Sequence, residues 1–232
     1  MDKRDVRGMT NDQLGALIAG NADPKARVAA IRELAGRRDP ASLPVLRRTI
    51  EQDAVADLRK EALLALERGN GIADSSQPIL RAMGDADPEV RLHALRIAGK
   101  HRISGAGARI CQLLDDPDRR VQAAAWNEIE DLKSPDAADC ALERFQKAPD
   151  AATKLRAIRI LRRAESKKVA PALAASLAGA DEKVQREILV ALRELRDASV
   201  IPQLEQVRQS TADRRLKKMI AETVGYLKRH AK

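Results

Sequence analysis

Aromatic residues are almost absent from this chain of 232 residues, which contains only Trp126, Phe145 and Tyr226. A single-core globule of this size normally packs around several aromatic side chains. The scarcity therefore favours a thin, two-layer stack of helices that packs through Ala, Leu, Ile and Val. Hydrophobic residues make up 44% of the chain and charged residues 33%, a composition that excludes an intrinsically disordered chain.

Long apolar runs and paired cysteines are also lacking. No run approaches the roughly 20 apolar residues that a membrane span needs, and the N-terminal stretch lacks the apolar core of a signal peptide. Cys111 and Cys140 lie far apart and form no CxxC motif, so we expect no disulfide framework. These features predict a protein of the reducing cytoplasm that has no membrane partner.

One pattern does recur along the chain. An Asp, often followed by Pro, precedes an aliphatic anchor, then Arg or Lys, then Ala and a bulky apolar residue. Successive anchors are 31 or 32 residues apart, and they are Ala26, Leu58, Val90, Val121, Thr153, Val184 and Leu216. Each unit is predicted to form two helices, the first capped by Asp and the second with proline in its first turn. These prolines are Pro44, Pro78, Pro171 and Pro202.

The repeat predicts an all-α solenoid, a right-handed superhelix of about seven stacked helical hairpins, because neither helix of a hairpin can bury its apolar stripe alone. We expect residues 1–9 to be flexible and residues 10–232 to form a single domain. Residues 10–20, with a capping box at Thr10 and Gln13, and residues 211–232 are predicted to be capping helices. The repeats between them are expected near 23–52, 53–84, 85–115, 116–147, 148–179 and 180–210.

The repeat resembles the HEAT-like repeat family, particularly its short bacterial form of the phycobilin-lyase type. The likeness is carried by Asp87-Pro88-Glu89-Val90-Arg91 with Ala94-Leu95, and by Asp116-Pro117 with Val121. Gln122 and Thr153 depart from the pattern, which makes the fourth and fifth repeats weaker. The resemblance implies a protein-binding scaffold whose second helices line a concave surface. It also implies, as its minority activities, DNA binding or action on bilin chromophores.

Basic residues gather where the first helix of each repeat ends. They are Arg37, Arg38, Arg68, Lys100, Arg102, Lys133, Arg162, Arg163, Arg196, Lys228 and Arg229, and we name them the basic edge. Further candidates on the second helices are Arg47, Arg48, Arg81 and Arg144. Two interpretations stay open: these cations complement helix dipoles, at about 0.3–1 kcal/mol each, or they bind an acidic partner.

The basic residue after each anchor is predicted to have a structural role. This side chain can reach the acidic turn of a neighbouring repeat and fix the register between hairpins. The residues concerned are Arg27, Arg59, Arg91, Lys154 and Lys217.

No catalytic or metal-binding motif is present in the sequence, and we expect neither a cofactor nor a metal. Cys111 and Trp126 are predicted to be packing residues. The chain has 43 Lys and Arg against 34 Asp and Glu, a net charge of +9. We therefore predict a non-enzymatic scaffold or adaptor that is monomeric by itself and binds a protein. The alternatives are nucleic-acid binding through the basic edge and a bilin lyase or isomerase.

Overall fold

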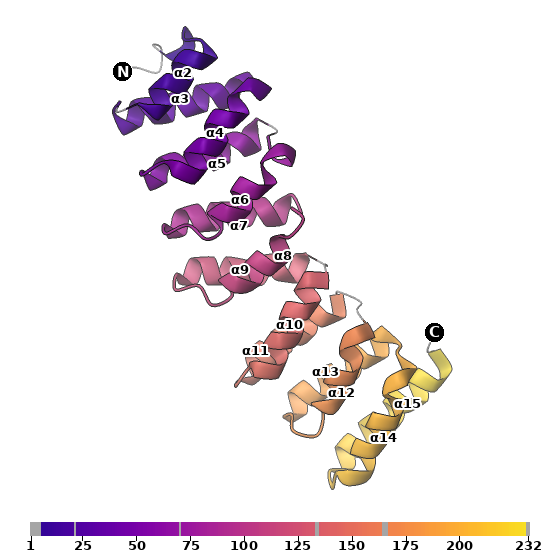
Figure 1. Ribbon diagram of the computed structural model, residues 1–232. Coiled ribbons are helices and arrows are strands. Elements are labelled where there is room, and N and C mark those ends of the chain that lie inside the picture. The colour runs from indigo at the N-terminus through magenta and orange to yellow at the C-terminus, as the bar shows by residue number, and fades with distance from the viewer. Residues whose placement is uncertain (1–5, 21, 70, 133–134, 164–166, 231–232) are drawn as a thin grey trace. The chain divides into compact units, whose positions relative to one another are not determined.

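The computed structural model describes residues 6–20, 22–69, 71–132, 135–163 and 167–230. Within these residues every regular element is a helix (Figure 1). The predicted all-α solenoid is thereby confirmed. The chain divides into two compact units, Met1–Glu128 and Ile129–Lys232, whose boundary falls inside helix α9 (Arg119–Asp131). We call them unit 1 and unit 2.

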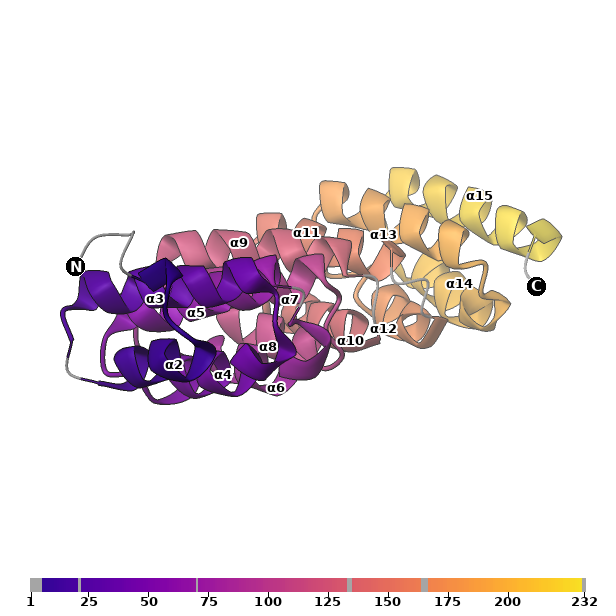
Figure 2. The same cartoon turned by 90° about the horizontal axis from the view of Figure 1, so that it is seen from above.

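Unit 1 consists of two layers of helices (Figure 2). The first helices of the hairpins, here named A helices, are α3 (Pro24–Arg37), α5 (Ala56–Arg68), α7 (Pro88–Lys100) and most of α9. The second layer holds the B helices α2 (Asn11–Ala19), α4 (Leu43–Gln52), α6 (Ser76–Ala82) and α8 (Ala106–Leu113). The predicted N-terminal capping helix is therefore a member of the B layer, where α2 packs against α3 and α4.

Unit 2 repeats the arrangement. Its A helices are α11 (Ala151–Arg163), α13 (Glu182–Leu195) and α15 (Arg214–His230), and neighbouring A helices contact one another. Its B helices are α10 (Pro135–Lys147), α12 (Ala170–Ala175) and α14 (Ile201–Ser210). Short 3-10 turns lead into several B helices: η1 (Pro40–Ser42), η2 (Ala73–Ser75), η3 (Lys167–Val169) and η4 (Ala198–Val200).

Several helices begin where the sequence predicts, but the predicted Asp cap is wrong for α5, whose N-cap residue is Val55 and makes no side-chain cap hydrogen bond. The Asp87 carboxylate accepts hydrogen bonds from the backbone N–H groups of Glu89 (2.8 Å) and Val90 (3.2 Å), and so satisfies donors that have no partner inside the helix. Thr10 and Gln13 form the predicted capping box at α2. Pro44 lies in the first turn of α4, where a missing N–H costs no hydrogen bond.

The core lies between the layers and is built mainly from aliphatic side chains. The anchors Ala26, Leu58, Val90, Val121, Val184 and Leu216 are all buried. The exception is Thr153, which is half-buried because its hydroxyl donates to Asp150, the residue that also accepts from the Thr153 N–H. Phe145 is fully buried, whereas Trp126 is half-buried.

The N-terminal segment predicted to be flexible lies partly outside the described residues, which begin at Val6. Val6 is buried and its carbonyl accepts from the Met9 N–H. The assignment of residues 10–232 to one domain stays a prediction.

Candidate binding surfaces

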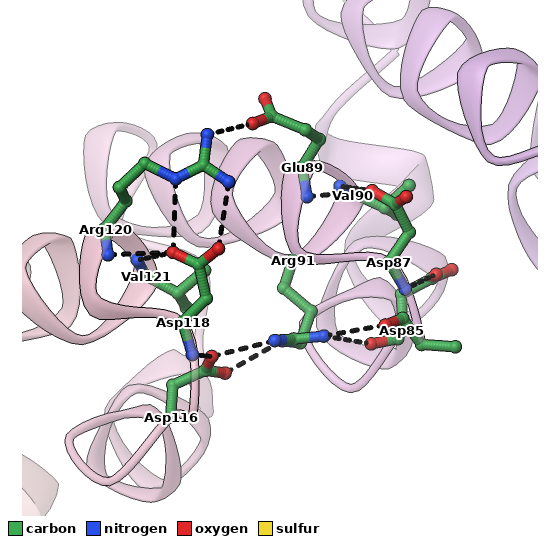
Figure 3. A network of polar contacts seen from close by, with 10 residues as sticks. Asp85, Asp87, Glu89, Val90, Arg91, Asp116, Asp118, Arg120 and Val121 are labelled. Carbon is green, nitrogen blue, oxygen red and sulfur yellow. Dashed lines mark hydrogen bonds and ion pairs between the residues drawn. The ribbon is translucent and has the colours of Figure 1, made fainter.

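Buried ion pairs join successive repeats of unit 1. Arg59 donates to both carboxylate oxygens of Asp85, through Nε (2.7 Å) and Nη2 (2.6 Å). Arg91 does the same to Asp116 at 2.8 Å and 2.8 Å, and its Nη1 also donates to the Asp85 carbonyl (Figure 3). Arg27 pairs with Asp53 in the repeat before them. Each arginine donates to a backbone carbonyl of the segment before its own helix and pairs with an Asp of the turn before the next A helix. We call these three pairs the Arg–Asp ladder.

The ladder residues are nearly inaccessible and electrostatically matched. The Asp116 side chain is only 3% exposed. The hydrogen bond to Asp85 raises the pKa of Arg59 above its ordinary value. Burial alone would raise the pKa of Asp85, but the hydrogen bonds from Arg59 and from the Asp87 N–H lower it below the ordinary value. These charges are paired with one another between the repeats, so they are not available to bind a ligand.

The predicted structural role of the residue after the anchor is thus confirmed for Arg27, Arg59 and Arg91. In two later repeats Gln takes this place: Gln122 donates to the Leu114 carbonyl at 3.0 Å, and Gln185 donates to the Ala180 carbonyl at 2.9 Å. Lys154 is half-buried and has no carboxylate partner among the described residues, so the predicted role is not seen there. The prediction is wrong for Lys217, which is exposed and pairs with no carboxylate among the described residues.

A second link between repeats lies beside the ladder. Asp118 caps α9 and accepts from the Arg120 guanidinium, which also pairs with Glu89 of α7 (Figure 3). These hydrogen bonds, first of all those from the Arg120 side chain, lower the pKa of Asp118 to about 2.

Much of the predicted basic edge is engaged in ion pairs. Arg37 donates to Glu33 (3.1 Å) and Asn11 (2.9 Å), and Lys100 pairs with Glu67 at 2.7 Å. In unit 2 the adjacent residues Arg162 and Arg163 also form ion pairs. Arg162 pairs with Glu187 and Glu194, and Arg163 pairs with Asp131. Neighbouring helices supply these carboxylates except Glu33, so Lys100, Arg162 and Arg163 help to hold the repeats together.

Other members of the basic edge are exposed and have no carboxylate partner among the described residues: Arg38, Arg68, Arg102, Arg196, Lys228 and Arg229. Three of these arginines adopt left-handed backbone conformations at or next to helix ends, with φ of 53° at Arg38, 49° at Arg102 and 51° at Arg196. Glycine is the usual residue there because a Cβ is unfavourable. Lys133 lies outside the described residues, and Arg144 is half-buried on α10.

The B helices of unit 1 expose a second set of arginines. Arg48 of α4 donates to the Gln52 side chain (3.2 Å), and Arg109 of α8 donates to the Gln112 side chain (3.3 Å). On α6, Arg81 pairs with Glu51 at 2.9 Å while 63% of its side chain stays exposed. The fourth candidate, Arg47, is half-buried and donates to the Ser75 hydroxyl at 3.1 Å. We call Arg48, Arg81 and Arg109 the arginine row.

A groove of about 520 Å³ lies between α2 and α4, beside the arginine row. Small residues of α2, among them Gly15 and Ala19, leave the space open, and a Cβ at Gly15 would lie 3.3 Å from Val45. Arg48, Gln52 and Asp12 supply polar groups to its lining. Its walls combine small apolar and polar side chains.

The B helices of unit 2 differ in charge. On α10 the exposed side chains include Asp136, Asp139 and Glu143, and on α14 they are mainly glutamines. The charge of the B layer therefore differs between the two units.

The cysteines correct one expectation. Both Cys111 and Cys140 are disulfide-bonded, and neither is free. The expectation of a chain without disulfides is therefore wrong, because separation along the sequence does not by itself exclude pairing. Cysteine usage therefore no longer supports a reducing compartment.

Residues 76–154, which cover α6 to the start of α11, match the family model described as HEAT repeats. This segment consists of HEAT repeats. The predicted resemblance is confirmed. Among curated proteins, no sequence matches the chain.

Several solved structures superimpose on the chain, and of the three that follow only the first reaches a TM-score of 0.5. A crystallised engineered protein superimposes with a TM-score of 0.51 at 16% identity, over 97% of this chain and 73% of that one. The complex of CpcE and CpcF of phycocyanin lyase from Nostoc sp. PCC7120 gives 0.49 at 16%, over 94% and 95%. A designed armadillo repeat protein in complex with the peptide (KR)4 gives 0.45 at 16%, over 94% and 100%. At such identities the likeness concerns the fold alone.

The described residues also bear on membrane spans and metal sites. No helix there is both long and apolar enough to cross a bilayer. No group of three or more His, Cys, Asp or Glu residues in that part of the chain is arranged to hold a metal ion.

The sequence does not identify every exposed basic residue. It gives no signal for Arg109, because α8 has no proline near its start to set the helix register. Arg214 and Lys218 lie exposed in the first turns of α15, whereas the sequence pattern places the basic edge where A helices end.

Proposed function

We propose that this protein is a non-enzymatic scaffold that binds an acidic, extended segment of a partner protein through the arginine row of unit 1. The observation that carries the proposal is the charge state of Arg48 and Arg109; the third member of the row, Arg81, pairs with Glu51 but keeps 63% of its side chain exposed. Arg48 and Arg109 are hydrogen-bonded to neutral amides, so their charges remain uncompensated at the surface. The Arg–Asp ladder holds the helices that carry them in a fixed register.

The spacing of the row suggests the form of the ligand. Stacked helices lie about 8–10 Å apart, and Arg48, Arg81 and Arg109 lie on three successive B helices. A polyproline II segment rises about 3.1 Å per residue with three residues per turn, so every third side chain lies on one face, about 9 Å from the next. An acidic residue at every third position would place one carboxylate at each arginine.

The other candidate surfaces offer less. On the basic edge, Arg37, Lys100, Arg162 and Arg163 are neutralised by carboxylates of the chain. This weakens the case for nucleic-acid binding there. No observation on the described residues favours a bilin lyase or isomerase.

The test uses synthetic peptides. A fluorescein-labelled peptide of four Glu-Pro-Ala units and a scrambled peptide of the same composition are titrated with the protein in fluorescence anisotropy at about 50 mM salt. We expect the periodic peptide to bind at least ten-fold more tightly than the scrambled one. The variant Arg48→Gln/Arg81→Gln/Arg109→Gln should lose this binding.

The matched control is Lys25→Gln/Arg96→Gln/Lys183→Gln, which removes three exposed charges from A helices and should bind as the wild type does. Equal affinity for the two peptides, or equal losses in the two variants, would contradict the proposal.

A further inference from the structure

Helix α15 carries more than half of the net charge of the protein. Its 17 residues include six Lys or Arg and one acidic residue, Glu222, whereas the whole chain has a net charge of +9. Such a concentration of one sign on a single helix is an electrostatic footprint for an anionic partner.

The charges of α15 lie on one face. Its buried stripe is Leu216, Ile220, Thr223, Val224 and Leu227. Arg215 and Glu222 pair with residues of α13, on the flank that faces that helix. The remaining cations, Arg214, Lys217, Lys218, Lys228 and Arg229, are all exposed, and we call them the α15 basic face. At 1.5 Å per residue the face extends over about 20 Å of the helix.

No carboxylate among the described residues neutralises the α15 basic face. Helix α11 differs in this respect, although it has a similar excess of cations and no acidic residue. There Arg156 and Arg159 pair with Glu130, and Arg162 and Arg163 pair with other carboxylates. Lys and Arg are almost never fully buried without partners, so the α15 face is also unsuited to packing against another helix.

Helix stability accounts for Lys228 and Arg229, which lie in the last turn, but not for the cations at the start of α15. Arg214, Lys217 and Lys218 occupy the first turns of α15, where the helix dipole is positive and favours acidic side chains. Three other A helices follow that rule, with Asp57, Glu89 and Glu182 in their first turns, whereas α3, α9 and α11 have no acidic residue there. The arrangement in α15 opposes the dipole, which points to a function that outweighs the loss of stability.

We propose that the α15 basic face binds the phosphate backbone of a nucleic-acid duplex without sequence specificity. The cations form two clusters, Arg214 with Lys217 and Lys218, and Lys228 with Arg229. The nearest members of the two clusters lie about 15 Å apart along the helix. A major groove is about 12 Å wide, so the clusters match the backbones on its two sides. Between them stand only the small residues Ala221 and Gly225 on this face.

The chemistry of the face favours phosphate over other anionic partners. It presents no aromatic side chain or amide to read bases or to anchor a protein interface. Helices that bind membranes insert an apolar face, but the apolar stripe of α15 is buried in the fold.

The test measures anisotropy of a labelled random-sequence duplex of 24 base pairs, as DNA and as RNA, at 50 and 200 mM salt. About four phosphate contacts predict that the Kd rises roughly 150-fold between the two salt concentrations. The variant Lys217→Glu/Lys218→Glu should bind at least ten-fold more weakly than the wild type. It should also melt no lower, because Glu is favoured near a helix N-terminus.

The control Lys25→Glu/Lys183→Glu lowers the net charge equally, also within the first turns of A helices, and should bind as the wild type does. Arg48→Gln/Arg81→Gln/Arg109→Gln should likewise keep duplex binding, which separates this site from the arginine row. The proposal is overturned if the wild type binds neither duplex at 50 mM salt, if the two Glu variants lose binding equally, or if the protein binds phosphatidylserine vesicles but not duplexes.

Discussion

Removal of Arg91 should sharply destabilise unit 1. Arg91 and Asp116 form two charge-assisted hydrogen bonds, and their side chains are 11% and 3% exposed. The substitution Arg91→Met keeps most of the aliphatic stem but leaves the Asp116 carboxylate buried without its cation, with only the bond from the Asp118 N–H. Loss of one partner of a buried pair costs about 3–5 kcal/mol. We expect the free energy of unfolding to fall by about 3 kcal/mol, because Asp116 keeps the hydrogen bond from the Asp118 N–H.

Urea unfolding followed by the fluorescence of Trp126 measures this effect within unit 1, where the single tryptophan lies on α9. With a slope of about 2 kcal/mol per M, a loss of about 3 kcal/mol lowers the midpoint by about 1.5 M. The control Arg96→Met removes an exposed arginine from the same helix and should change stability by less than about 0.5 kcal/mol.

A double-mutant cycle completes the test. Arg91→Met combined with Asp116→Asn should be less destabilising than the sum of the two single changes, since the double variant leaves no unpaired buried charge. If Arg91→Met behaved like Arg96→Met, or if the two changes were additive, the ladder would not hold the repeats together as argued here.

Three further outcomes are expected. Arg38→Gly should raise the free energy of unfolding by about 0.5–1 kcal/mol, because relief of the left-handed strain exceeds the lost dipole interaction. The melting temperature measures this effect, and a lower melting temperature in the variant would contradict the prediction. Because the pKa of Asp85 is lowered on folding, its stabilisation is complete above the ordinary aspartate pKa of about 3.9 and is lost as pH falls through the lower folded value. At pH values below 4, the urea concentration at the unfolding midpoint should therefore decrease. This decrease should be smaller in the variant Arg59→Met than in the wild type. A thiol reagent should find neither Cys111 nor Cys140 reactive in protein purified without reductant, and two free thiols would contradict the structure.

The sequence predicted the fold well because each repeat is marked by residues whose effects are local. Asp caps, prolines in first turns and aliphatic anchors each act within a few residues, so their recurrence could be read directly. It also identified the ladder arginines, because position after the anchor fixes the direction of the side chain. It could not identify Thr153 as a half-buried anchor, since that depends on the hydrogen bond with Asp150.

What only the tertiary structure decided is the state of each charge. Arg162 and Lys218 are both basic residues on A helices, yet one pairs with Glu194 and the other faces solvent. The difference arises from side chains about one repeat away, whose reach depends on the packing of neighbouring helices. The sequence by itself determined the repeat, most cap positions and the place of the residue after each anchor, because these follow from the backbone's own periodicity. The stack decided which cations are left for a partner, because ion pairing is a property of neighbours in space.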